Sequence, residues 1–328
     1  MSHPLLYLTR LLPEPLMTAL RERYTLVSEP AEDHLPSDED RRKGFAQADA
    51  VICTLTDPVT DALLATAPLL KIVANYAVGY NNIDVAAATR RGIIVTNTPD
   101  VLTNATADLT WALMLAVARR VVEGDRWTRS GSWPGWAPTQ MLGTDVSGRT
   151  LGIIGMGRIG RAVARRAAGF DMRVLYTSRH GLPHSVLYAG WEQASRQKVI
   201  ERSDFLSLHV PLTESTHHLI GAQELAAMKP TAILLNTARG PVVDEAALLG
   251  ALQQGTIAGA GLDVYEREPK IQAGLEQLSN VVLLPHLGSA TQETRIKMGL
   301  ICVENIEAVL AGKAPLNPVG RHSRSADD

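Results

Sequence analysis

Residues 151–160 read LGIIGMGRIG, in which a short apolar run leads into Gly155, Gly157 and Gly160. The run is typical of a buried parallel strand, and the residues after the glycines have the apolar spacing of a helix. Glycines at these intervals permit a tight turn, a close approach of ligand to backbone, and close packing of helix on sheet. The stretch predicts an α/β domain that holds the pyrophosphate of a dinucleotide, against the alternative of a glycine-rich turn without a ligand.

Short apolar runs alternate with helical segments along most of the chain. In the first part the runs are 5–8, 50–55, 70–75 and 92–97, and the helices between them are 13–22, 59–66 and 85–91. In the second part the runs are 151–155, 173–177, 205–210, 232–237, 257–264 and 281–285. This alternation predicts two lobes, each with a parallel sheet covered by helices on both faces.

Two longer helices are expected to link the lobes. The segment 99–120 follows a Pro-Asp start signal, is apolar enough to be buried between lobes or subunits, and marks the crossing into the second lobe. The segment 290–312 is expected to return to the first lobe. Its expected buried face consists of Ile296, Leu300, Val303, Ile306 and Leu310.

The composition excludes several classes of protein. The chain has 328 residues, 45% of them hydrophobic and 20% charged, and its net charge of −2 gives no long-range attraction to nucleic acid. Cys53 and Cys302 lie far apart without a ligand pattern, so neither a disulfide framework nor a metal site is expected. No apolar run approaches the ~20 residues of a membrane span, and no secretion signal is evident, so we expect a cytoplasmic protein.

Three charged residues lie at or just after predicted strand ends of the second lobe, where open α/β sheets bind ligands. They are Arg239, whose planar guanidinium suits a carboxylate, Glu268 and His286. Each alone has a structural explanation, as a partner of a surface acid, a solvated loop charge or a strand cap. Because all three emerge on the edge that carries the glycine turn, a catalytic site is the better interpretation.

Several long motifs occur in one order between about residues 45 and 312. They are ANYAVGYNNID (74–84), NATADLTWAL (104–113), GIIGMGRIG (152–160), HVPLTEST (209–216), NTARGPVVDEAAL (236–248), GLDVYEREP (261–269) and LPHLGSAT (284–291). In these the chain resembles the D-isomer-specific 2-hydroxyacid dehydrogenases, most closely their glyoxylate/hydroxypyruvate reductase branch. The predicted fold is then two doubly wound parallel-sheet, Rossmann-like domains, in which the cofactor domain (99–286) is inserted in a flavodoxin-like substrate domain (1–98 plus 287–328).

The resemblance implies a role for each charged residue. Arg239 would hold the carboxylate and ketone oxygen of the substrate, and His286 would protonate the carbonyl oxygen as hydride arrives from the nicotinamide. Glu268 would pair with His286. A carboxylate beside an imidazole favours the charged ring, which suits a general acid near neutral pH.

The resemblance also implies substrate and cofactor contacts. The N–H groups of Val78 and Gly79 would bind the substrate carboxylate, with Asn75 nearby, although an ordinary turn is the alternative. Thr106 matches a position that touches the cofactor, and Asp263 one near the nicotinamide carboxamide. The other cofactor contacts would be Gly155, Gly157, Arg158, Ile159, Gly160, Ser178, Arg179, Val210, Pro211, Thr216, Thr237, Ala238, His286 and Gly288.

The stretch YTSRH (176–180) lies where an Asp or Glu normally holds the ribose hydroxyls of NAD. An acid would repel the 2′-phosphate of NADP, whereas Ser178 can donate a hydrogen bond to that phosphate and Arg179 can pair with it. NADP(H) is therefore predicted as the preferred cofactor and NAD(H) as a second one. A surface arginine beside a neutral loop is the alternative.

Trp133 and Trp136, in SWPGWAP, resemble a loop that in some relatives reaches the active site of the neighbouring subunit. Plain interface packing explains them equally well. Both interpretations predict a homodimer.

The predicted reaction is the reduction of glyoxylate, hydroxypyruvate and, by extension, 2-ketogluconate to D-2-hydroxy acids. Phosphite dehydrogenases carry a lysine at the place of Val78, formate dehydrogenases carry a glutamine at the place of Glu268, and 3-phosphoglycerate dehydrogenases often add a regulatory domain. The first two activities are less favoured because this chain has Val78 and Glu268 at those positions, and the third because only about sixteen residues follow the last helix. A nucleotide-sensing corepressor is the alternative from another class of protein. Such a protein should show little reduction of glyoxylate or hydroxypyruvate by NADPH.

Overall fold

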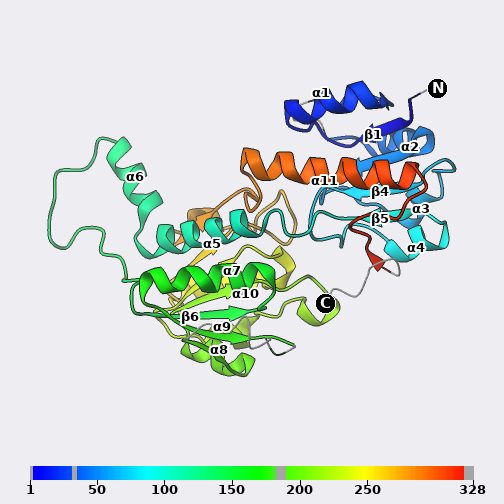
Figure 1. Ribbon diagram of the computed structural model, residues 1–328. Coiled ribbons are helices and arrows are strands. Elements are labelled where there is room, and N and C mark those ends of the chain that lie inside the picture. Colours follow the sequence, from blue (N-terminus) through cyan, green and yellow to red (C-terminus); the bar gives the residue numbers. More distant parts are fainter. Residues whose placement is uncertain (1–2, 32–34, 180, 182–189, 321–328) are drawn as a thin grey trace. The chain divides into compact units, whose positions relative to one another are not determined.

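The computed structural model describes residues 3–31, 35–179, 181 and 190–320 (Figure 1). The chain divides into two compact units. Met1–Leu102 together with Thr291–Asp328 form the discontinuous unit, and Thr103–Ala290 form the inserted unit. Each unit has its own parallel sheet, so the prediction of two parallel α/β structures is confirmed.

The sheet of the discontinuous unit has five strands, and all of its neighbouring strands are parallel. The strands are β1 (Leu5–Leu8), β2 (Thr25–Leu26), β3 (Ala50–Cys53), β4 (Ile72–Asn75) and β5 (Ile94–Thr96). Their order across the sheet is β2-β1-β3-β4-β5, which is the flavodoxin-like order. The flavodoxin-like fold expected for this part of the chain is confirmed.

Helices cover both faces of this sheet (Figure 1). They are α1 (Glu14–Arg23), α2 (Asp38–Gln47), α3 (Asp61–Leu64), α4 (Val85–Arg90) and α11 (Gln292–Leu310). Phe45 of α2, Leu64 of α3 and Ala87 of α4 share one core with Val51 and Val73 of the strands. The helix α11 packs on β4, β5 and α1, and so returns to the first lobe as predicted.

The buried face of α11 differs from the expected one. Val303 and Ile306 are buried as expected, but Leu300 is 46% exposed, and the buried face also includes Met298 and Cys302, which were not expected there. Gly299 is also buried because α1 lies so close that a Cβ there would be 2.1 Å from Leu16 Cδ1. The expected face was therefore partly wrong, and close packing at a glycine carries no apolar signal.

The sheet of the inserted unit has seven strands, again all parallel. They are β6 (Thr150–Ile154), β7 (Arg173–Thr177), β8 (Trp191–Gln193), β9 (Phe205–Leu208), β10 (Ile233–Asn236), β11 (Gly259–Leu262) and β12 (Val281–Leu283). Their order is β12-β11-β10-β9-β6-β7-β8. The order reverses between β6 and β9, which is the point where doubly wound sheets bind ligands. The glycine turn follows β6 directly.

Successive residues of these strands enter different cores. Ile153 and Leu235 belong to the core under α5 (Thr103–Ala118) and α7 (Arg158–Arg166). Ile154 and Leu234 belong to the core on the other face. That face is covered by α8 (Arg196–Arg202), α9 (Ala222–Ala227) and α10 (Glu245–Gln253). Among the described residues of this unit, 3₁₀ turns occur at Ala167–Phe170, Glu214–Thr216, Gly240–Val242 and Leu275–Gln277.

The helix predicted over 99–120 is α5, which packs against α7, β10 and β11 of its own unit. After it, α6 (Val121–Arg129) and the loop that follows project from the rest of the inserted unit (Figure 1). We call residues 121–145 the projecting arm. Trp133 and Trp136 on this arm are 49% and 82% exposed.

Some further expectations concern single residues. Cys53 and Cys302 are buried free thiols, and burial raises the pKa of both. Within the described residues, no helix is long and apolar enough to cross a membrane. Over the same part of the chain, no group of three or more His, Cys, Asp or Glu side chains could hold a metal ion.

Candidate active site

The glycine turn after β6 is shaped by backbone contacts. Gly155 has φ +100°, and a Cβ there would lie 2.6 Å from the carbonyl oxygen of His209. A Cβ at Gly160 would lie 2.2 Å from the carbonyl oxygen of Gly155. Only glycine fits at these two positions. Gly157, in contrast, faces open space at the start of α7, where an added Cβ meets nothing within 4 Å.

This turn fits the pyrophosphate of a dinucleotide. Gly157 is the N-cap of α7 and provides no side-chain cap, so the first N–H groups of the helix, beginning at Arg158 and Ile159, point toward the open side of the turn. Gly155 N–H donates to the Thr177 carbonyl at 3.0 Å, which ties the turn to the end of β7. Ser178, half-buried, and Arg179, exposed, follow there; His180 lies outside the described residues.

Arg239 follows the end of β10 and is held by its neighbours. Asn236 Nδ2 donates to the Arg239 carbonyl at 2.9 Å, and Asn236 Oδ1 accepts from Ala238 N–H at 3.1 Å. The Arg239 guanidinium donates to the Ala238 carbonyl at 2.6 Å. Burial lowers the pKa of Arg239, and the charge of Glu268 opposes that shift. The Arg239 side chain is therefore a partly desolvated cation that interacts electrostatically with the carboxylate of Glu268.

Glu268 and His286 form the predicted pair, with Glu268 Oε2 2.9 Å from His286 Nδ1. The other carboxylate oxygen accepts from Tyr265 N–H at 3.1 Å. Burial by itself would raise the pKa of Glu268, but His286, Tyr265 N–H and Arg239 together hold it below the usual value. Glu268 is thus an ionised carboxylate, and its bond to Nδ1 leaves the Nε2 atom of His286 for other partners.

Asp263 fixes the backbone around His286. The His286 residue has φ +56°, a left-handed conformation that few non-glycine residues adopt. Its N–H donates to the Asp263 carbonyl at 3.0 Å, while the N–H groups of Leu287 and Gly288 donate to the Asp263 carboxylate at 2.6 and 2.8 Å. Thr106 then donates to the Gly288 carbonyl at 2.9 Å. Three predicted cofactor residues, Thr106, Asp263 and Gly288, therefore form one bonded cluster.

Asp263 is buried, and burial raises the pKa of its carboxyl group against the opposing effects of Leu287 N–H, His286 and Gly288 N–H. The remaining predicted cofactor residues lie on neighbouring strand ends. Val210 and Pro211 follow β9, and the Thr216 hydroxyl donates to the Pro211 carbonyl at 2.7 Å. Thr237, after β10, shares a 2.9 Å hydrogen bond with Thr110 of α5.

The predicted substrate residues belong to the discontinuous unit: Asn75 is the last residue of β4, and Val78 and Gly79 lie in the loop that follows. Asn75 is fully buried, and its Nδ2 donates to the Gly79 carbonyl at 2.8 Å. Asn75 therefore supports the loop from within. Val78 and Gly79 are half-buried.

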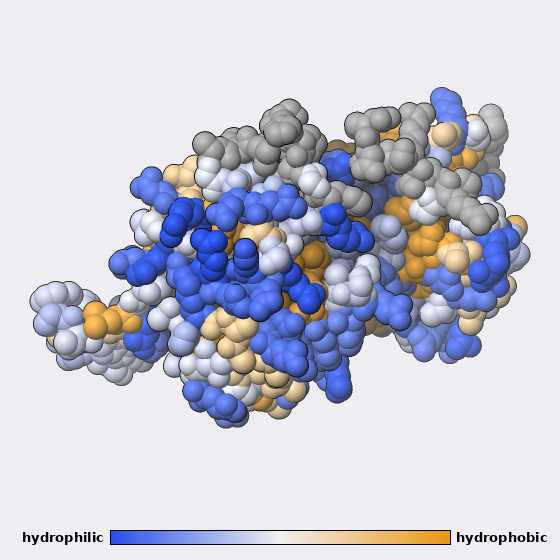
Figure 2. All heavy atoms as spheres, turned by 90° about the horizontal axis from the view of Figure 1, so that it is seen from below, coloured by the Kyte–Doolittle hydropathy of each residue, from blue (hydrophilic) through white to orange (hydrophobic). Residues whose placement is uncertain are grey.

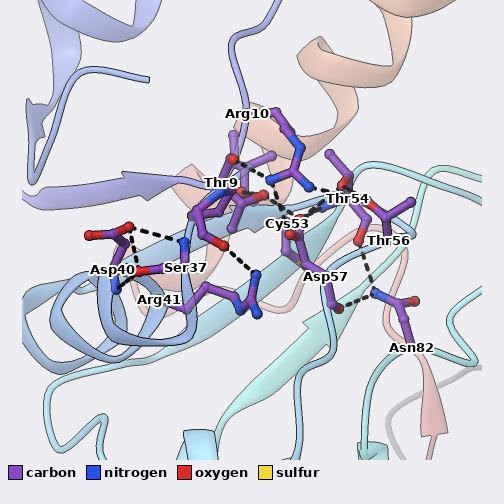
Figure 3. Close-up of polar contacts among 12 residues, drawn as sticks. Thr9, Arg10, Ser37, Asp40, Arg41, Cys53, Thr54, Thr56, Asp57 and Asn82 are labelled. Atoms are coloured by element: carbon purple, nitrogen blue, oxygen red, sulfur yellow. Dashed lines mark hydrogen bonds and ion pairs between the residues drawn. The ribbon is translucent and has the colours of Figure 1, made fainter. Parts of the chain in front are cut away.

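A buried carboxylate organises the neighbouring strand ends (Figure 3). Asp57 Oδ2 accepts from Thr9 Oγ1 at 2.5 Å and from the N–H of Thr54 at 2.8 Å, and Arg10 lies 3.2 Å from its other oxygen. Asn82 Nδ2 donates to the carbonyls of Thr54 and Asp57 at 3.0 and 3.1 Å. This network joins the ends of β1 and β3 to the loop after β4.

Sequence reasoning missed several residues that support the site. Tyr265 gives its N–H to Glu268 and its hydroxyl to the Leu284 carbonyl at 2.8 Å, two residues before His286. Asn236 supports Arg239 through backbone atoms. The residue types alone did not indicate these roles, although Asn236 lies in the NTARG motif and Tyr265 in the DVYEREP motif.

The chain also matches a known protein family. Residues 111–288 match the family described as "D-isomer specific 2-hydroxyacid dehydrogenase, NAD binding domain". The chain belongs to this family. Its inserted unit carries the NAD-binding domain, and the dehydrogenase family expected from the motifs is confirmed.

Curated relatives of this dehydrogenase include glyoxylate reductases. One from Thermococcus litoralis is 53% identical over 279 residues, 84% of each chain. One from Korarchaeum cryptofilum is 50% identical over 320 residues, 97% of this chain and 96% of the relative. The dehydrogenase is thus placed in the glyoxylate reductase branch, as an NAD(P)-dependent oxidoreductase that reduces glyoxylate-type 2-oxo acids.

Solved structures resemble the dehydrogenase over nearly its full length. The TT0316 protein of Thermus thermophilus has a TM-score of 0.90 and 45% identity, with 96% of this chain and 100% of that chain covered. An NADPH-dependent glyoxylate/hydroxypyruvate reductase from Sinorhizobium meliloti, in complex with NADP and malonate, has a TM-score of 0.84 and 37% identity, with 97% of each chain covered.

Proposed function

We propose that the protein reduces glyoxylate and hydroxypyruvate, and the longer 2-ketogluconate, to D-2-hydroxy acids, with NADPH preferred over NADH and His286 as proton donor. The observation that carries the proposal is the 2.9 Å hydrogen bond between Glu268 and His286, with Arg239 close enough to influence the carboxylate. The functional boundaries 99–286 for cofactor and 1–98 plus 287–328 for substrate are part of the same proposal.

In this proposal each residue acts on a stated atom. The guanidinium of Arg239 holds the carboxylate and carbonyl oxygens of the 2-oxo acid, and the Val78 and Gly79 N–H groups bind the carboxylate. The nicotinamide cofactor, when bound, supplies the hydride. His286 releases its Nε2 proton to the carbonyl oxygen, and the negative charge of Glu268 at Nδ1 stabilises the protonated ring before transfer.

The catalytic assignment is tested with His286→Ala. General acids contribute about 10²–10⁴-fold, so kcat for glyoxylate should fall by that factor while the Kd for NADPH changes little. Wild-type turnover in this variant would refute the role of His286. A substrate panel of glyoxylate, hydroxypyruvate and 2-ketogluconate measures the range.

The proposed preference for NADPH rests on the two residues that follow the end of β7. Ser178 and Arg179 stand at the end of the strand whose Thr177 carbonyl bonds to the glycine turn. No acid occurs at these two positions, and the NADPH-dependent Sinorhizobium relative was solved with NADP. We expect kcat/KM to be higher with NADPH than with NADH, and Arg179→Ala to narrow the ratio by about tenfold. Equal use of NADH by the native protein would refute the preference.

We also propose a homodimer in which the projecting arm contacts a second copy. Trp133, Trp136, Val121 and Leu142 on the arm are between 49% and 82% exposed. In Figure 2 the projecting segment at the left is mostly pale, with a small orange, hydrophobic patch near its junction with the rest of the unit. Light scattering should give twice the mass of 35.4 kDa, and Trp136→Ser should lower it. The cytoplasmic location stays a prediction.

A further inference from the structure

Three consecutive carbonyl groups in the loop after β4 accept hydrogen bonds from the neighbouring strand ends. The Ala77 carbonyl accepts from Thr98 N–H at 3.0 Å. The Val78 carbonyl accepts from Asn97 Nδ2 at 2.8 Å, and the Gly79 carbonyl from Asn75 Nδ2 at 2.8 Å.

These bonds also fix where the N–H groups point. In a trans peptide the N–H points opposite to the carbonyl of the same plane. The three planes carry the N–H groups of Val78, Gly79 and Tyr80. Because the donors all lie at the ends of β4 and β5, which pair in parallel, the N–H groups turn away from that edge.

These N–H groups remain available to a ligand. Within the described part of the chain, no protein acceptor lies on the N–H of Val78, Gly79 or Tyr80. Val78 and Gly79 are half-buried and Tyr80 is exposed, so the groups are reachable. Successive backbone N–H groups that face one side form a site for an anion.

We propose that Asn97 is a positioning residue for recognition of the substrate carboxylate. Its amide holds the Val78 carbonyl from behind and thereby aims the Gly79 N–H at the carboxylate. The inference rests on the proposed function, in which Val78 and Gly79 bind that group. Thr98 holds the Ala77 carbonyl through its backbone N–H, whereas the Val78 carbonyl is held by the side chain of Asn97, so a side-chain substitution at Asn97 tests the peptide plane that carries the Gly79 N–H.

The position of Asn97 is itself braced by the end of the chain. Asn97 N–H donates to the Asn317 carbonyl at 3.2 Å, and the Val319 N–H donates to the Val95 carbonyl at 2.9 Å. Asn305 of α11 is fully buried, and its Oδ1 accepts from the N–H of Asn317 at 3.0 Å. Hydrogen bonds from the segment after α11 therefore hold the backbone of Asn97 in place, as a positioning role requires.

Loss of the Asn97 side-chain amide should lower the affinity for the substrate carboxylate more than it lowers kcat. Hydrogen bonds to charged groups correspond to roughly a 10- to 100-fold change in affinity, and misdirecting one of the N–H donors should cost about the lower figure. Because the carboxylate is bound in both ground state and transition state, the loss should appear in KM.

The test compares Asn97→Ala with wild type in the full chain. We expect about a tenfold higher KM for glyoxylate and a similarly raised Kd for oxamate, a carboxylate that is not reduced, measured on the complex with NADPH. The kcat and the Kd for NADPH should change less than threefold. Asn97→Ser retains a polar group but is too short to reach the Val78 carbonyl, and it should give the same result if the alanine variant does not fold.

The matched control is Asn280→Ala. It removes the same kind of bond, Asn280 Nδ2 to the Ala258 carbonyl at 3.2 Å, just before β12 in the inserted unit, and should leave the KM unchanged. Unchanged oxamate affinity in both Asn97 variants would overturn the inference. A uniform loss of kcat, NADPH affinity and melting temperature would also overturn it, since that pattern indicates a structural role only.

Amide NMR of wild type labelled with ¹⁵N-valine and ¹⁵N-glycine separates this inference from the proposed function. Oxamate should shift the Val78 and Gly79 signals. If they do not shift, the proposed carboxylate site is wrong. If they shift and Asn97→Ala binds oxamate normally, only the role of Asn97 is wrong.

Discussion

Replacing Gly240 with alanine should move two proposed catalytic residues, Arg239 and Glu268, apart. A Cβ at Gly240 would lie 1.8 Å from the carbonyl carbon of Tyr265, 2.0 Å from its oxygen and 2.4 Å from the nitrogen of Glu266. All three atoms are backbone, so no side chain can rotate away. The segment that begins with Arg239 and the segment that leads to Glu268 must therefore move apart by about 1 Å.

The cost follows from what each segment carries. Arg239 directly precedes Gly240, and the N–H of Tyr265 orients Glu268. A misplacement of about 1 Å in an active site can reduce the rate roughly 10²-fold, and overpacking typically costs about 1–3 kcal/mol of stability. We expect kcat/KM for glyoxylate to fall about a hundredfold. The free energy of unfolding should decrease by about 1–3 kcal/mol.

Steady-state kinetics with glyoxylate and urea unfolding monitored by circular dichroism measure the two effects. Gly250→Ala is the control: it lies in α10, and its Cβ would have only Gln254 Nε2 nearby, at 3.9 Å. Alanine in a helix interior is favoured over glycine by about 0.5–1 kcal/mol, so the control should be at least as stable and fully active. Activity of Gly240→Ala within threefold of wild type would show that the two segments need not be in contact.

Two further predictions concern stability. The pKa of Glu268 lies below its usual value of 4.5, so its interactions stabilise the fold above pH 4.5 and are lost as the pH falls through the lower folded value. The stability of wild type relative to Glu268→Gln should therefore decline as the pH falls below 4.5, and a constant difference in urea unfolding would contradict the pairing. Gly152→Ala places a Cβ 1.8 Å from Ser203 Oγ and should cost about 1–3 kcal/mol, while adding Ser203→Ala should restore part of it because Ser203 Cβ, at 2.8 Å, still interferes; no recovery would contradict this contact as the cause.

The sequence predicted the strands well because parallel strands buried on both faces are continuous apolar runs. The runs at 173–177 and 232–237, for example, correspond to β7 and β10. Elements without such a run were missed, among them β2, α2 and β8. The helix α2 buries only Gly44 and Phe45 and is otherwise mostly charged, so its start is set by the capping box of Ser37 and Asp40, not by periodicity. The edge strand β8 has three residues, none of them buried.

The site was predicted unevenly for a physical reason. Arg239, Glu268 and His286 carry their chemistry in their side chains, and the motifs around them identify it. Asn97 and Tyr265 act on backbone carbonyl and N–H groups, and such contacts depend on loop geometry that residue types do not encode. The left-handed backbone of His286 was equally invisible, because it is imposed by distant Asp263.

The split of one unit between the two ends of the chain orders events on the ribosome. The inserted unit is complete once residue 290 has been synthesised, whereas α11, which packs on β4 and β5, is made last. A nascent chain therefore holds a finished nucleotide-binding unit while β4 and β5 of the earlier-made sheet still lack the helix that packs on them. Chaperone demand during synthesis should be greatest in that interval, and a truncation before α11 should leave the protein insoluble even though every proposed catalytic residue is present.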